Sequence, residues 1–293
     1  MSTMNLAELG IVDTHCHMWQ LELVRQTWLM PELKPLFRTF EPDDLAQASH
    51  DVGVGTCVLI EAGTTTEENH ELARQATSSE LIGAVLPFAD LESPRLAEEL
   101  DDWQSDPKFR GVRMRFEGHP DPDILSRPGI VEGLKILARR CLVFEFLVRS
   151  SHLKDIPRIY ERLPELKGVI EHMAKPDVVG GSDSAAWYQQ MEVLAQDTNV
   201  TCKLSLSPQV ERIEELLTHP GSGWPVELIK PYVHFLIEHF GFDRLMWGSD
   251  WPVLLLVSDY EGTYQAMRDA IGPLDVGDEL RLFRKTAMRF YGV

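Results

Sequence analysis

Short runs of β-forming residues alternate along this chain with longer stretches of helical periodicity, and this alternation limits the possible folds more than any other feature. Parallel strands joined by crossover helices produce such a pattern. Eight apolar runs can be counted, at 11–17, 54–60, 81–88, 111–116, 142–148, 167–173, 200–206 and 244–250. Eight such units in 293 residues predict an α/β fold, a (β/α)8 barrel of the TIM type that forms one domain over residues 1–293.

An open, doubly wound sheet is the alternative arrangement. That fold commonly binds nucleotides through a GxGxxG or GxxxxGK[ST] loop after a strand, and no such loop follows any of the eight runs. The barrel is therefore favoured, and active sites in barrels lie at the carboxyl ends of the strands. The irregular segment 19–44, with two tryptophans and three prolines, is predicted to form a loop over this end, and 219–227 a smaller one.

The charge balance excludes some classes of partner. Lys and Arg number 28 against 46 Asp and Glu, a net charge of −18, which opposes binding to nucleic acid. We expect no membrane partner and a cytoplasmic location, because no apolar run is long enough to cross a bilayer and the first residues lack basic side chains. The four cysteines form no CxxC pair and are predicted to be reduced. Monomer and homo-oligomer both remain open.

Polar residues stand at the carboxyl ends of three predicted strands. His15 and His17 share one face of the first run because side chains alternate along a strand, and both imidazoles can reach one cation. His172 and Asp250 occupy the ends of two later runs. A pair of hydrogen-bonded core histidines is the alternative, but the position of the pair at the catalytic end favours a site. Glu171 and Ser249 have the opposite parity and are expected to face helices or loops.

Charged residues also interrupt the apolar runs. Arg113, Glu145 and Lys203 are expected inside the barrel, where an unpaired charge is costly, so they must meet one another, a cation or a polar ligand. A structural polar plug is the alternative, but the charges come from several strands and favour a site. We assign these three residues to substrate binding. Trp19 and Trp251 are predicted to stack on a sugar ring, with ordinary packing as the alternative.

The motifs DTHCHMW, EHMAKP, VTCKLSLS and FGFDRLMWGSDWPV resemble those of amidohydrolase-related proteins, which include fuconolactonase- and rhamnonolactonase-type sugar lactonases and 2-pyrone-4,6-dicarboxylate lactonase. The resemblance runs from about residue 11 to the C-terminus. It implies a distorted, amidohydrolase-type barrel, hydrolysis of a lactone, and an active site at His15, His17, His172 and Asp250. Two-metal members carry a further histidine on a middle strand, where this chain offers Lys203. The resemblance therefore implies one divalent metal, zinc first, held by the three histidines and Asp250, or no metal.

A mechanism follows as a hypothesis. Asp250 acts as general base on the water that attacks the lactone carbonyl, and His172 with His15 and His17 stabilises the oxyanion directly or through the metal. The expected partner is a small lactone or carboxylic acid. A mononuclear zinc decarboxylase of the same superfamily is the first alternative, because it uses the same ligand pattern. A barrel that binds a small ligand without catalysis is the second.

Overall fold

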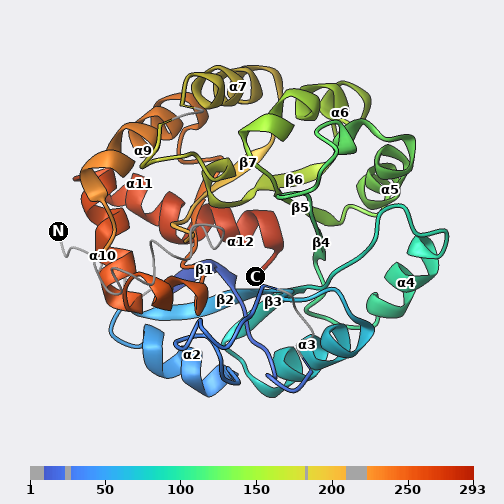
Figure 1. The fold of residues 1–293 in the computed structure, drawn as a ribbon, viewed down its shortest axis with the longest axis horizontal. Coiled ribbons are helices and arrows are strands. Elements are labelled where there is room, and N and C mark those ends of the chain that lie inside the picture. The colour runs from blue at the N-terminus through green and yellow to red at the C-terminus, as the bar shows by residue number, and fades with distance from the viewer. Residues whose placement is uncertain (1–9, 24–27, 182–183, 209–222) are drawn as a thin grey trace.

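The computed structural model describes residues 10–23, 28–181, 184–208 and 223–293. Within these ranges parallel strands line the centre of the molecule and helices surround them (Figure 1). The strands are β1 (Ile11–Cys16), β2 (Val54–Ile60), β3 (Ile82–Leu86), β4 (Gly111–Arg115), β5 (Val143–Leu147), β6 (Lys167–Ile170), β7 (Thr201–Leu204) and β8 (Leu245–Trp247). Each lies within one of the eight predicted runs, so the predicted fold class is confirmed.

The helices that surround the strands pack one apolar face on the barrel. They are α2 (Pro42–Ser49), α3 (Thr66–Ser78), α4 (Leu96–Trp103), α5 (Pro128–Arg139), α6 (Ile156–Arg162), α7 (Ser184–Asp197), α9 (Val226–Phe240) and α10 (Tyr260–Ile271). Local sequence sets their ends: the Thr65 side chain accepts a hydrogen bond from the backbone of Glu68 at the start of α3, and Pro128 occupies the first turn of α5. No helix in the described ranges is long and apolar enough to span a bilayer.

The barrel is distorted at two seams. Strands β1 to β3 form one hydrogen-bonded sheet and β4 to β8 another. Isolated bridges and backbone hydrogen bonds outside the strands close the gaps: Phe88 pairs with Arg113 between the β3 and β4 sides, and the backbone N–H of His17 donates to the carbonyl of Trp251 at 2.7 Å between the β1 and β8 sides. The seam between β1 and β8 lies beside the candidate residues His15, His17 and Asp250.

The C-terminal segment closes the amino-terminal end of the barrel. After α11 (Val276–Leu280), the short helix α12 (Thr286–Tyr291) lies across the middle of the ring in Figure 1. Its Ala287 and Tyr291 pack against lumen-facing side chains of the strands, namely Val12, Val58, Ile60, Ala84, Leu86, Val143, Val169 and Met246. This end of the lumen is a filled apolar core, so a binding site can form only at the opposite end.

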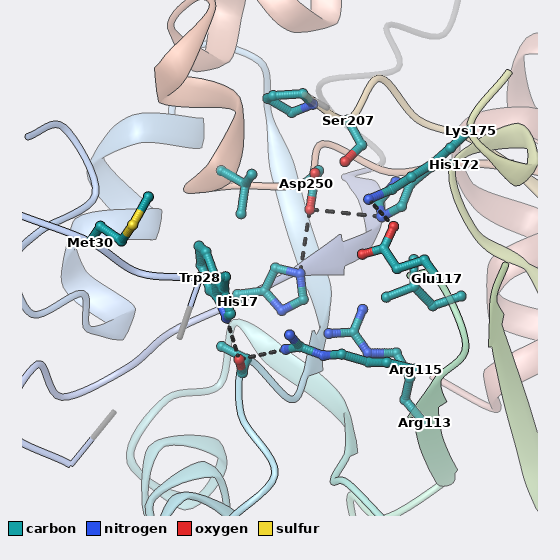
Figure 2. Close-up of a pocket in the computed structure, with 14 residues that line it drawn as sticks. His17, Trp28, Met30, Arg113, Arg115, Glu117, His172, Lys175, Ser207 and Asp250 are labelled. Atoms are coloured by element: carbon teal, nitrogen blue, oxygen red, sulfur yellow. Dashed lines mark hydrogen bonds and ion pairs between the residues drawn. The ribbon is translucent and has the colours of Figure 1, made fainter. Parts of the chain in front are cut away.

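The loop after β1 covers part of that opposite end, as predicted. Within the described part of segment 19–44, Trp28 and Met30 reach the barrel mouth (Figure 2). The predicted smaller loop at 219–227 lies outside the described residues up to position 222, and α9 begins at Val226.

Candidate active site

A cavity of about 310 Å³ opens at the carboxyl ends of the strands. Figure 2 shows His17, His172 and Asp250 pointing toward one another on one side of it, with two arginines below. The lining residues come from most of the barrel, and are His17, Trp28, Met30, Ala62, Arg113, Arg115, Glu117, Leu147, His172, Lys175, Ser207, Pro208, Asp250 and Val253. The structure therefore brings together residues that are more than 200 positions apart in sequence.

Hydrogen bonds across the β1/β8 seam position the first and last motifs. Asp13 accepts hydrogen bonds from the backbone N–H of His15 at 3.0 Å and from the hydroxyl of Ser249 at 2.6 Å, so its carboxylate ties the two strands together. The backbone N–H of Asp250 donates to the carbonyl of His15 at 2.9 Å. Ser249 therefore faces Asp13 and the start of α10, where the hydroxyl of Tyr260 donates to the same carboxylate at 2.7 Å, which agrees with its expected orientation toward helices or loops.

Three nitrogen and oxygen atoms converge at this seam. His15 Nε2 lies 3.1 Å from His17 Nε2, and Asp250 Oδ1 lies 3.3 Å from His17 Nε2 and 3.7 Å from His15 Nε2. His172 Nε2 is farther away, 3.9 Å from Asp250 Oδ1. His15 is fully buried behind His17 and is not among the residues that line the cavity.

A left-handed turn presents His172 to the cavity. After β6 ends at Ile170, four consecutive non-glycine residues, 172 to 175, have positive φ between 46° and 58°. Each such residue costs about 1–2 kcal/mol, because its Cβ crowds the following carbonyl oxygen. The turn sends both its first and its last side chain, His172 and Lys175, into the same cavity, and Asp250 has a positive φ of 61° as well. Backbone strain is thus concentrated at the candidate site.

Burial and neighbouring charges set the protonation states. Burial lowers the pKa of His15 and His17, and it lowers the pKa of His172 to about 3, with Lys175 adding to the effect. Burial alone would raise the pKa of Asp250. Three neighbours, His172, His17 and Lys175, oppose burial and lower this pKa to about 2. At neutral pH the site therefore holds uncharged imidazoles beside an ionised carboxylate.

The converging donors can be tested against the needs of a metal. Ligands of a tetrahedral zinc ion lie roughly 3.3 Å from one another, because each metal–ligand bond is about 2.0–2.1 Å long. The donors of His15, His17 and Asp250 are 3.1 to 3.7 Å apart, so their spacing fits one zinc ion. His15 with Glu171 and His172 forms a second group of close donors.

A layer of ion pairs forms the floor of the cavity. The guanidinium of Arg113 contacts Glu61 Oε1 at 2.7 Å and Glu171 Oε2 at 3.0 Å, and Arg115 contacts Glu61 Oε2 at 2.9 Å. Glu171 is completely buried in the lumen, so its expected outward orientation is wrong, because the chain leaves the strand geometry at this residue. Burial raises the pKa of Glu171 to about 8 against the opposing effect of Arg113.

A further ion pair stands at the rim. Lys175 Nζ contacts Glu117 Oε2 at 2.6 Å, and both side chains line the cavity. The half-buried indole of Trp28 donates to the carbonyl of Ala62 at 3.3 Å, which fixes the ring against the cavity wall. The rim therefore combines paired charges with one aromatic surface.

Two predicted substrate-binding residues lie below the cavity instead. Lys203 and Glu145 are both fully buried, form an ion pair of 2.7 Å with each other, and are absent from the cavity lining. Their predicted contact with substrate does not agree with this placement. The reason is depth, because both belong to strand interiors and their side chains meet inside the lumen.

The two tryptophans chosen from sequence are also placed elsewhere. Trp19 and Trp251 are each 1 % exposed, pack edge-to-face on Phe40, and are not among the residues that line the cavity. Both tryptophans are therefore packed in the core, which was the alternative to stacking on a substrate. Trp28 was predicted only as part of the loop over the barrel, and it supplies the aromatic surface of the cavity.

Two residues of the cavity wall and floor that were not predicted had a signal in the sequence. Glu117 continues the alternation of Arg113 and Arg115 by one more step, and Glu61 directly follows the apolar run of β2. Both residues lie just beyond the predicted strands, so a search for polar residues that included these positions would identify them. Lys175 had no such signal, because its position depends on the left-handed turn.

Comparison with known proteins gives a consistent family assignment. A family model described as Amidohydrolase matches residues 12–293. An L-fucono-1,5-lactonase of Burkholderia ambifaria is 32% identical over 87% of this chain and 84% of its own, and a 2-pyrone-4,6-dicarboxylate hydrolase of Comamonas testosteroni is 25% identical over 83% and 77%. The crystal structure of a Burkholderia multivorans amidohydrolase with bound zinc superposes with a TM-score of 0.86, at 26% identity over 97% of this chain and 99% of that one.

Proposed function

Because the chain belongs to the amidohydrolase family, we propose that it opens the ring of an uncharged sugar lactone by attack of water on the carbonyl carbon. The chain is a hydrolase of this superfamily, and lactone hydrolysis is the activity for which the relatives are named. The observation that carries the proposal is that an ionised carboxylate, Asp250, lines the same cavity as two side chains that can donate hydrogen bonds, His172 and Lys175.

Asp250 is the general base in this proposal. Its carboxylate is ionised at neutral pH because its pKa is lowered to about 2, and it borders the cavity where a water molecule would stand. It takes a proton from that water as the oxygen bonds to the lactone carbonyl, and returns the proton to the ring oxygen when the acyl–oxygen bond breaks. The products are a carboxylic acid and a free hydroxyl on one open chain.

His172 and Lys175 stabilise the negative charge that develops on the carbonyl oxygen. His172 Nδ1 lies 2.9 Å from the hydroxyl of Ser205, and in the proposed reaction that hydroxyl donates to Nδ1, so that the proton of the imidazole is on Nε2. The ammonium of Lys175 lies at the rim on the same side. Two donors held by a rigid turn need little reorganisation during the reaction, which is how an oxyanion site lowers a barrier.

A metal would occupy the seam beside these residues. His15, His17 and Asp250 would hold it, as their spacing allows. When bound, a divalent cation supplies Lewis-acid stabilisation of charge on oxygen.

The charges around the cavity favour a neutral substrate. Among the described lining residues, each cationic side chain already contacts a carboxylate. These cations are Arg113, Arg115 and Lys175, and their partners are Glu61, Glu171 and Glu117, so none of the three is left free to bind a substrate anion. A dicarboxylate lactone would need at least one cation released from its partner, whereas a polyol can bond to paired groups as they stand.

Proton release tests the proposal. L-Fucono-1,5-lactone added to the protein in a weakly buffered indicator solution should acidify the solution faster than the uncatalysed reaction, and the Asp250→Asn variant should lose most of this rate. Release of carbon dioxide from 2,6-dihydroxybenzoate without lactone opening would contradict the proposal and identify a decarboxylase. Saturable lactone binding without turnover would contradict it and identify a binding protein.

A further inference from the structure

We propose that Lys203 is a positioning residue that holds the proton of His15 on Nε2, so that this imidazole donates to His17 and is not a ready metal ligand. The inference rests on the hydrogen bonds beneath the candidate site and is independent of which substrate the site accepts. It also gives a role to the buried Lys203–Glu145 pair, which the proposed reaction does not use.

The direction of the hydrogen bonds is fixed first at the His17 end. His17 Nδ1 lies 2.9 Å from the backbone carbonyl of Ile60, and a carbonyl oxygen can only accept. His17 therefore carries its proton on Nδ1, and its Nε2 presents a lone pair when the ring is neutral. His15 Nε2 lies 3.1 Å from that lone pair, so the contact is a hydrogen bond only if His15 Nε2 carries a proton.

The contacts of Lys203 with His15 indicate independently that the proton of His15 is on Nε2. Lys203 Nζ lies 3.2 Å from His15 Nδ1, 2.7 Å from the carbonyl of Thr14 and 2.7 Å from Glu145 Oε2. An ammonium group has three N–H donors and no acceptor, and here it has two hydrogen-bond partners, Thr14 and His15, and an ion-pair partner, Glu145. It therefore donates to His15 Nδ1, which must be unprotonated, and the proton of the neutral ring is left on Nε2.

This arrangement conflicts with metal binding at His15. A metal-bound histidine needs a lone pair on the ligating nitrogen and donates from its other nitrogen to an acceptor. For His15 Nε2 to ligate, its proton would have to move to Nδ1, where it would point at the Lys203 ammonium. The donor spacing fits zinc, but the hydrogen bonds favour His15 as a donor, so Lys203 should weaken metal binding.

The position of Lys203 depends on the far end of the barrel. The hydroxyl of Tyr291, in α12, donates to Glu145 Oε1, and Glu145 Oε2 holds Lys203. All three side chains are buried, so Lys203 has little freedom to turn away from His15. The C-terminal helix thus contributes to the protonation pattern of the site through these two contacts.

Long-range ¹H–¹⁵N correlation spectra of the wild-type protein test the proton assignment directly. The expected spectrum shows His15 protonated on Nε2 and His17 protonated on Nδ1, with assignment by the His15→Gln and His17→Gln variants. A spectrum that shows His15 protonated on Nδ1 overturns the proposal.

Zinc affinity of the metal-free protein tests the consequence. Competition with a chromogenic chelator should give at least about tenfold tighter zinc binding in Lys203→Met than in the wild type, the size typical of groups that contact a metal ligand. Lys203→Met/Glu145→Gln removes both buried charges and serves if the single variant does not fold. Val58→Ala is the matched control, because it removes buried lumen volume but no hydrogen bond of Lys203 or His15, and its zinc affinity should match the wild type. Loss of the site in His17→Asn confirms where zinc binds.

The outcomes separate this inference from the proposed function, because neither experiment measures turnover. Zinc binding by Lys203→Met, or by the double variant, within about threefold of the wild type overturns the inference. So does an equal increase in Val58→Ala, which would show that any disturbance of the lumen admits zinc.

Discussion

The two ends of this barrel are built from the same strands and yet differ in almost every physical respect. At the amino-terminal end, aliphatic lumen residues pack on α12 and complete a core. At the carboxyl end, the lumen holds ion pairs, uncharged histidines and residues with positive φ around a cavity. The first end is packed as a protein interior and contributes stability, whereas the second retains buried charge and backbone strain, both of which cost stability.

This difference shows where a change should alter turnover and where it should alter folding. Side chains at the carboxyl end are arranged for a ligand, so their removal should appear mainly in catalytic rate. Side chains at the amino-terminal end have no access to a ligand, so their removal should appear mainly in the free energy of unfolding. Substitutions that fail to follow this division would break the comparison.

The largest effect is expected for Asp250→Asn at the carboxyl end. Loss of the general base should lower kcat for lactone opening by about 10²- to 10⁴-fold, because the amide cannot accept a proton from water. Initial rates by pH indicator measure this, and circular dichroism checks that the variant is folded at 25 °C. Near-normal turnover would remove Asp250 from the mechanism.

Met246→Ala is the matched change at the amino-terminal end. Met246 is fully buried in the lumen cluster with α12, so truncation should lower the free energy of unfolding by about 2–5 kcal/mol. Urea unfolding measures the loss, and kcat/KM at 25 °C should stay within about twofold of the wild type. A large fall in kcat/KM with unchanged stability would contradict the division between the two ends.

A pH-dependent effect should come from Glu68, behind the carboxyl end. Burial, with Glu61 adding, raises the pKa of Glu68 from 4.5 to about 7, so the folded protein holds this proton more tightly than the unfolded chain. The stabilisation is complete below pH 4.5 and is lost as the pH rises through about 7, amounting to about 3 kcal/mol at most. Urea unfolding between pH 5 and 8 should therefore show a steeper decline for the wild type than for Glu68→Gln, and equal slopes would refute the assignment.

The smallest effect is expected where positive φ occurs at the amino-terminal end. Cys141 follows α5 with a φ of 56° and is exposed, so its backbone strain serves the helix terminus and no cavity. Cys141→Gly should raise the free energy of unfolding by about 0.5–1 kcal/mol relative to Cys141→Ala, because glycine adopts this conformation without steric cost. Thermal unfolding of the two variants measures the difference, and an alanine variant as stable as the glycine variant would be the contrary result.

The sequence predicted the strands and the carboxyl-end motifs well, because both depend on local pattern. All eight strands lie where alternating or continuous apolar runs predicted them. His17, His172, Asp250 and Arg113 line the cavity because each stands at or near the end of a strand that points its side chain into the lumen. The predicted roles of these residues remain predictions.

The placement of the other site residues depends on three-dimensional geometry that the sequence pattern does not contain. Lys203 and Glu145 were expected to meet a ligand, yet depth along the strand decides that they meet each other. Trp19 and Trp28 belong to the same loop, and only its path places one in the core and the other at the cavity. Lys175 reaches the site through a left-handed turn that helix and strand periodicity cannot predict.

The measurement that tests the central claim most directly is the ratio of kcat/KM for L-fucono-1,5-lactone to that for 2-pyrone-4,6-dicarboxylate with the wild-type protein. The lining cations are paired with carboxylates, so the account predicts efficient opening of the neutral lactone and a ratio above about 10², since the dianion would leave charges poorly compensated in the cavity. Efficient opening of the dicarboxylate with no activity on the neutral lactone would contradict the account.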